Sequence, residues 1–162
     1  RVDTRLLHGQ VATGWTHSTH PDRIIVVSDT VCHDKLRTNM IKQAAPSGVQ
    51  VHVIPIKNMV KANNDPRFGD TRAMLLFESV EDALAAVKAG VDVKEINLGS
   101  SAYKEGKVNV TKALSFDQTD VDAIKELQSL GVKFDVRGVP SDSPANVDAL
   151  IKSAETKLAE KK

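Results

Sequence analysis

The sequence predicts an α/β protein, a single domain with an open, mostly parallel β-sheet and helices on both of its faces. Short runs of β-branched and aliphatic residues alternate along the chain with segments of helical periodicity, as in successive βαβ units. Several of these runs are apolar nearly throughout, as strands covered on both faces are. With no linker, repeat or low-complexity segment, residues 1–162 are expected to form one domain.

Five segments are the clearest strand candidates: 23–28 (RIIVVS), 49–54 (VQVHVI), 72–77 (RAMLLF), 95–99 (EINLG) and 132–139 (VKFDVRGV). The sequence begins with Arg1 rather than methionine, and we expect a short segment before it. Together with Val2 that segment would form a first strand. Residues 3–7 would then be the loop at its carboxyl end.

Apolar spacing and stop residues predict the helices. Three segments have helical periodicity and end at a proline or a glycine: 34–45 before Pro46, 81–89 before Gly90, and 121–130 before Gly131. A first helix is expected to begin over 9–15. The last helix is expected to open at Ser143, with Pro144 in its first turn, and to run into the charged tail.

Composition excludes several classes of protein. The 22 basic and 21 acidic residues nearly cancel and form no basic run, so a nucleic acid is not an expected partner. The single cysteine, Cys32, excludes an internal disulfide and a CxxC metal site, and it fits a reducing cytoplasm. No apolar run approaches the roughly 18 residues of a membrane span, and no secretory signal is evident.

The stretch RVDTRLLHGQV places an acid, an arginine and a histidine in the first predicted loop. Ligands of open parallel sheets bind beyond the carboxyl ends of the strands, where this loop would lie. His8 would stand at a helix start, where free amides favour a phosphate. Arg5 offers a planar cation for phosphate oxygens, and Asp3 would fix the imidazole tautomer or position Arg5. Gly9 leaves room for a ligand.

These features make His8 a candidate nucleophile for a phosphoryl group. The alternative from the residues alone is an ordinary solvated turn. Ser28 and Asp29 end the next strand at the same edge, where each would bind near a phosphate or cap the following turn. Lys35 and Arg37 would attract an acidic partner or the phosphoryl group, or else lie on a solvated helix face.

Two further features bear on partners. The small residues Gly99, Ser100 and Ser101 follow a strand and would let a partner's phosphohistidine approach closely. Trp15, on the first helix, is expected to pack in the core rather than to stack on a sugar. Because no set of aromatic residues lines a pocket in the sequence, this chain is not expected to bind the sugar alone.

A resemblance extends over essentially the whole chain. The segments DTRLLHGQVATGWT, RIIVVSD, KQAAP, INLG and DVRGVPSD resemble the IIB component of the mannose/fructose/sorbose family of the bacterial sugar phosphotransferase system, nearest to mannose-type members. The resemblance implies that His8 accepts a phosphoryl group, with Arg5 beside the phosphate and with Gly9 and Gln10 completing the block. Thr4 departs from the family pattern, in which many members have an acid or an amide.

The resemblance also implies the partners. The phosphoryl donor would be the IIA component, and the acceptor would be a sugar held by the membrane components IIC and IID. The protein would therefore be cytoplasmic and peripherally associated with the inner face of the membrane. No metal and no cofactor are expected.

Two other functions remain open from the residues. A receiver-like signalling module would be phosphorylated on Asp29, although no convincing acidic pocket for magnesium is evident. A phosphatase resembling phosphoglycerate mutase would also place a histidine after its first strand. That family has an arginine where this chain has Leu7, and no second catalytic histidine is evident here.

Overall fold

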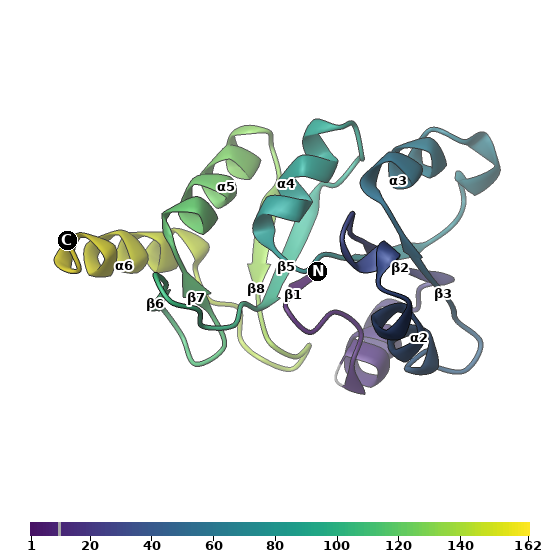
Figure 1. The fold of residues 1–162 in the computed structure, drawn as a ribbon, viewed down its shortest axis with the longest axis horizontal. Helices are drawn as coiled ribbons and strands as arrows, with labels where there is room; N and C mark the ends of the chain where they lie inside the picture. Colours follow the sequence, from purple (N-terminus) through teal and green to yellow (C-terminus); the bar gives the residue numbers. More distant parts are fainter. Residues whose placement is uncertain (10) are drawn as a thin grey trace.

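The computed structural model describes residues 1–9 and 11–162 (Figure 1). Its main strands are β1 (Val2–Asp3), β2 (Arg23–Val27), β3 (Gln50–Ile54), β4 (Ala73–Leu76), β5 (Glu95–Ser100) and β8 (Lys133–Val136). They pair in the orders β3-β2-β4 and β1-β5-β8, and every one of these pairings is parallel. The predicted α/β class with a mostly parallel sheet is therefore confirmed.

Phe77 joins the two groups of strands. Its amide donates to the carbonyl of Arg1, and its carbonyl accepts from the amide of Asp3, each at 3.0 Å. The combined order is β3-β2-β4-β1-β5-β8. The chain forms β2, β3 and β4 on one side of β1 and then crosses to the other side for β5 and β8. The switch in strand order therefore lies at β1, where a ligand site is expected.

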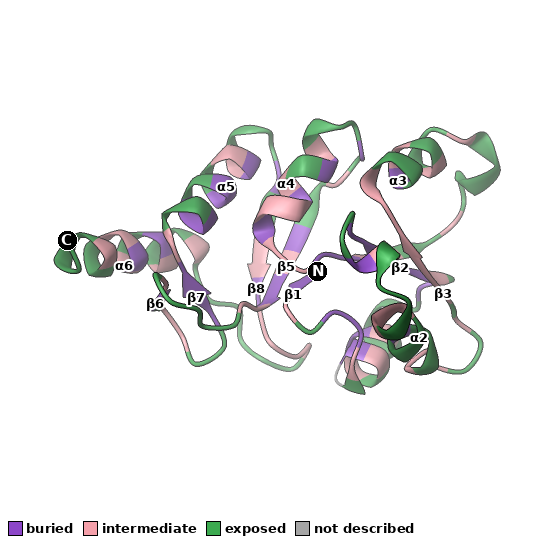
Figure 2. Ribbon diagram, viewed as in Figure 1, coloured by how far each residue is buried: buried purple, intermediate pink, exposed green. Residues whose placement is uncertain are grey.

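Helices cover both faces of the sheet. One face carries α3 (Ile56–Asn63), α4 (Val80–Lys88) and α5 (Gln118–Ser129), and the other carries η1 (Val11–Trp15), α1 (Thr16–Thr19) and α2 (Lys35–Gln43) (Figure 1). Along β2, Ile25 and Val27 pack into a cluster with α4 and α5, whereas Ile24 and Val26 pack with side chains of η1 and α2. Figure 2 shows buried residues along the strands and on the inward sides of α4 and α5.

The last helix, α6 (Val147–Glu160), begins later than predicted. The Ala145 amide donates to the Val136 carbonyl at 3.0 Å, so the segment before the helix forms an antiparallel bridge beside β8. The Asn146 side chain then caps the helix by accepting from the Ala149 amide. The predicted start at Ser143, with Pro144 in the first turn, is therefore wrong.

Several short elements were not predicted. They are α3, the 3-10 turns η2 (Val31–His33) and η3 (Pro66–Phe68), and the antiparallel pair β6 (Val108–Asn109) and β7 (Ser115–Phe116). The first helix is a π-helical turn, η1, continued by the single α-helical turn α1. Its start positions the candidate site.

Candidate functional site

The loop after β1 turns at Leu6 and returns His8 to the end of the strand. The Leu6 amide donates to the Asp3 carbonyl at 2.9 Å and closes a tight turn. Leu6 has a φ of 58°, in the left-handed region that large side chains rarely adopt. Its side chain is fully buried with Leu7 and Val11, and this apolar packing offsets the backbone strain. Leu6 was not predicted as a site residue, because a φ angle leaves no pattern in the sequence.

Asp3 lies at the centre of the site with its carboxylate fully buried. Its Oδ2 lies 3.0 Å from His8 Nε2, and its Oδ1 accepts a hydrogen bond from the Arg5 amide at 2.9 Å. The Arg5 Nε lies 3.6 Å from the same Oδ1. The structure therefore brings the three predicted residues together, and Asp3 contacts both of the others.

Arg1 is a fourth member of this cluster. Its guanidinium is almost completely buried and donates to Asp3 Oδ2 at 2.9 Å. It also donates to Asn97 Oδ1 and to the carbonyl of Arg137. A Cβ at Gly99 would overlap the Arg1 guanidinium, so the glycine makes room for this cation. The sequence could have predicted this role of Arg1. Residues i and i+2 of a strand point to the same face, which places the side chains of Arg1 and Asp3 together.

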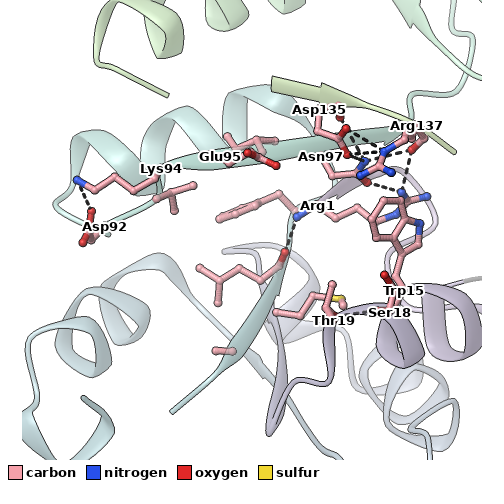
Figure 3. Close-up of a pocket in the computed structure, with 16 residues that line it drawn as sticks. Arg1, Trp15, Ser18, Thr19, Asp92, Lys94, Glu95, Asn97, Asp135 and Arg137 are labelled. Carbon is pink, nitrogen blue, oxygen red and sulfur yellow. Dashed lines mark hydrogen bonds and ion pairs between the residues drawn. The ribbon is translucent and has the colours of Figure 1, made fainter. Parts of the chain in front are cut away.

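Figure 3 shows Asn97, Asp135, Arg137 and Trp15 around the Arg1 side chain. Arg1 and Arg137 lie over the Trp15 ring, with guanidinium carbons 5.3 and 5.5 Å from its centroid. The Trp15 indole donates to the Gly138 carbonyl at 2.9 Å. Trp15 is buried, as expected, and packs against these two arginines.

The remaining contacts of His8 define its chemistry. The ionised carboxylate of Asp3 can only accept a hydrogen bond, so the neutral imidazole donates from Nε2 and keeps the lone pair on Nδ1. The His8 side chain is 18% exposed and that of Arg5 is 57% exposed. The ring is therefore partly accessible, beside a cation that faces solvent. The His8 carbonyl begins the helix by accepting from the Ala12 amide at 2.7 Å.

The residues predicted at the end of β2 are engaged in local structure. Ser28 is buried, and its hydroxyl accepts from the Val31 amide at 3.1 Å. This hydrogen bond caps the following turn, which is one of the two roles expected for Ser28. Asp29 Oδ1 accepts from the Ile56 amide at 2.8 Å and so ties the rim to the start of α3. Neither residue has a described contact with the Asp3–His8 cluster.

The other predicted residues lie around the rim. Arg37 pairs with Glu78 (2.8 Å), and the Ser100 carbonyl accepts from the Thr4 amide (3.2 Å). Gly9 is exposed, and a Cβ built there would meet nothing within 4 Å, so the space beside it is open. Gln10 lies outside the described residues.

One group of acidic side chains has the spacing of metal ligands. Glu81, Asp117 and Asp120 place carboxylate oxygens within 4.8 Å of one another. Asp117 and Asp120 form the capping box of α5, and the Lys107 ammonium donates to Asp120 Oδ2 at 2.7 Å. Backbone amides and a lysine therefore already bind oxygens of the two aspartates.

The environment of Asp3 shifts its pKa. Burial alone raises the pKa of this carboxyl, but the hydrogen bonds from His8 and from the Arg5 amide, with the charge of Arg1, together hold it below its usual value. The folded protein therefore keeps Asp3 ionised at lower pH than the unfolded chain does. The stabilisation is complete above the unfolded value of about 3.9 and is lost as the pH falls through the folded value.

We expect the Asp3→Asn variant to show a weaker acid dependence of stability. Its free energy of unfolding should fall less than that of the wild type between about pH 5 and pH 2, because the depressed carboxyl is gone. Denaturant titrations across this range measure the difference. The variant Asp70→Asn, which removes an exposed carboxylate, controls for the loss of one charge. Parallel curves for the wild type and Asp3→Asn would show that Asp3 contributes no pH-dependent stability.

Together, the parallel sheet and the Asp3–Arg5–His8 cluster define an α/β protein with an oriented histidine at its switch point. The family model for the PTS system sorbose subfamily IIB component matches residues 1–162. This chain belongs to that family, whose members are phosphotransferase components.

Individual relatives agree with this assignment. The chain is 41% identical over 151 residues to the PTS system mannose-specific EIIAB component of Escherichia coli K12, covering 93% of this chain and 47% of that protein. It thus spans about half the length of that relative. It is 38% identical to the PTS system sorbose-specific EIIB component of Lacticaseibacillus casei, covering 93% and 92%. The crystal structure of the IIBSor domain of the Klebsiella pneumoniae sorbose permease superposes with a TM-score of 0.90 at 38% identity, covering 94% of each chain.

Within the described part of the chain, every helix is too short or too polar to cross a membrane.

Proposed function

We propose that this chain is a phosphocarrier. It accepts a phosphoryl group on His8 from a phosphorylated IIA component and passes it to a sugar held by the membrane components IIC and IID. The observation that carries the proposal is the 3.0 Å contact between His8 Nε2 and the buried Asp3 carboxylate, with Arg5 exposed beside them. A histidine so oriented can act as a nucleophile without a metal ligand or a second base.

The hydrogen bond to Asp3 selects the attacking atom. Because Nε2–H is directed to Asp3, the lone pair on Nδ1 attacks the phosphorus of the donor's phosphohistidine. The new N–P bond forms at Nδ1 while the donor's N–P bond breaks, and the electron pair of that bond returns to the donor imidazole. Asp3 retains its hydrogen bond throughout and stabilises any positive charge on the ring. Arg5 provides charge-assisted hydrogen bonds to the phosphoryl oxygens.

The second transfer reverses the role of His8. A sugar hydroxyl attacks the phosphorus, the Nδ1–P bond breaks, and the hydroxyl proton leaves to the solvent or to a base of the membrane partner. The described residues present no enclosed sugar pocket beside His8, which fits a sugar bound by IIC and IID. The protein would work in the cytoplasm, at the inner face of the membrane.

Phosphorylation of Asp29 is an alternative that the chemical stability of the phosphorylated residue can exclude. Asp29 already accepts the Ile56 amide, and it has no described contact with the cationic cluster around His8. A phosphohistidine is labile to acid and stable to base, whereas an aspartyl phosphate is destroyed by base and by hydroxylamine. A phosphatase like phosphoglycerate mutase would instead turn over a free phosphate ester.

The direct test is to phosphorylate the ¹⁵N-histidine-labelled chain with phosphorylated IIA and to record long-range ¹H–¹⁵N spectra. We expect one histidine to change, with the shift pattern of an Nδ1-phosphorylated ring, and a label that survives base and is lost in acid. Phosphorylation at Nε2 would contradict the role given to Asp3. A base-labile label would contradict the phosphohistidine itself.

A further inference from the structure

The large apolar side chains that the described residues expose are unevenly distributed. The three most exposed are Leu36 (72%), Met40 (62%) and Tyr103 (58%). Leu36 and Met40 lie four positions apart on α2 and form one ridge, which starts where α2 leaves the carboxyl edge of the sheet. Tyr103 follows β5 at the same edge. Isolated exposed hydrophobics need no explanation, but these gather on the edge that carries His8.

The exposed apolar residues form two groups, the Leu36–Met40 ridge and Tyr103. Specific contacts attach both groups to the strands next to the His8 loop. On one side, Arg37 of α2 pairs with Glu78 at 2.8 Å, and Glu78 directly follows Phe77, which bridges β1. On the other side, the Thr4 hydroxyl accepts from the Ala102 amide at 3.0 Å. Thr4 thus links the loop that carries Tyr103 to the loop that carries His8. The apolar groups therefore stand on either side of the candidate nucleophile.

A partner centred on His8 would contact both the Leu36–Met40 ridge and Tyr103, because a protein interface covers a wide area. A standard interface buries about 800 Å² per partner, which corresponds to a patch with a radius of about 16 Å. Neighbouring strands lie about 4.8 Å apart, and β4 and β5 are the immediate neighbours of β1. A donor that brings its histidine to His8 must therefore cover the attachment points of both groups.

The charge nearest His8 indicates the kind of partner. Arg5 is an exposed cation in the His8 loop, whereas the exposed cations Lys35 and Lys104 each lie beside an exposed acid, Asp34 and Glu105. A donor that presents a phosphohistidine carries a dianionic group at the centre of its interface, which Arg5 complements. Methionine and leucine side chains around such a centre supply adaptable apolar contact.

We infer that Leu36, Met40 and Tyr103 form the docking surface for the protein that donates the phosphoryl group. This inference rests on the proposed function, since it assigns the face that meets the donor at His8. The apolar groups determine how tightly the donor binds, and Arg5 and Asp3 act on the transferred group itself.

The test uses two variants, Leu36→Ser combined with Met40→Ser, and Tyr103→Ser. Leu130→Ser is the matched control, because Leu130 is 51% exposed but ends α5 at the opposite edge of the sheet. The rate of phosphotransfer is measured against the concentration of phosphorylated IIA. We expect the KM for the donor to rise about tenfold in each docking variant, with kcat near the wild-type value. Leu130→Ser should match the wild type in both constants.

Phosphoramidate, a small phosphoryl donor that needs no docking surface, separates docking from chemistry. It should label His8 equally in the wild type and in all three variants. An unchanged KM in both docking variants would overturn the inference, as would a parallel loss of phosphoramidate labelling. A defect seen only in transfer to sugar in vesicles containing IIC and IID would assign this face to the membrane acceptor instead. Failure of the wild-type His8 to take label from either donor would overturn the proposed function itself.

Discussion

Replacing His8 with alanine should abolish the transfer of labelled phosphate from phosphorylated IIA to this chain. The expected loss is complete, because no other described side chain combines an accessible nucleophilic nitrogen with the Asp3 hydrogen bond and the Arg5 cation. The fold should persist. In the variant, Asp3 keeps its hydrogen bonds from Arg1 and from the Arg5 amide, so the buried carboxylate is not left without partners.

Three measurements on His8→Ala define the result. Label incorporation should fall to background, the circular dichroism spectrum should match that of the wild type, and the thermal midpoint should lie near the wild-type value. His17→Ala is the matched control, since His17 is an exposed histidine on α1. Retained labelling of a folded His8→Ala protein would move the phosphorylation site to another residue.

The sheet was predictable because its strands are apolar on both faces. The runs at 23–28 and 72–77 require cover on two sides, and periodic helices with clear stop residues follow them. The start of α6 was not predictable in the same way. Ser143 and Pro144 are good helix-starting residues, but the bridge between Ala145 and Val136 keeps this segment extended. A tertiary contact thus overrides a local signal.

The candidate site was predictable in part. The sequence places Asp3, Arg5 and His8 within six positions. Because these positions belong to one loop at a strand end, their side chains are expected to lie close together. The support behind them comes from distant parts of the chain. Asn97 binds the Arg1 guanidinium and Gly99 makes room for it, and both come from β5, which only the strand order places beside β1. A single sequence does not specify which strands become neighbours.

The second large effect is expected at Arg5. Its guanidinium is exposed and only loosely paired with Asp3, at 3.6 Å, so it is available to bind phosphoryl oxygens. A charge-assisted hydrogen bond contributes about 1.5 to 3 kcal/mol, which corresponds to roughly a 10- to 150-fold change in rate if it is made in the transition state. We therefore expect phosphotransfer from IIA to slow by about this factor in Arg5→Ala.

Arg5→Lys separates charge from geometry, because lysine keeps the cation but loses the planar fork that binds two oxygens at once. Its rate of transfer should fall between those of the wild type and Arg5→Ala. Arg67→Ala, which removes an arginine that is 82% exposed and remote from His8, should leave the rate unchanged. The measurement is the single-turnover rate at saturating donor, where weakened docking no longer contributes. Because the Arg5 backbone amide, rather than its side chain, makes the close bond to Asp3, the variants should keep the loop and lose only the cation. Wild-type rates in both Arg5 variants would show that Arg5 takes no part in the transfer and that only Asp3 and His8 act in it.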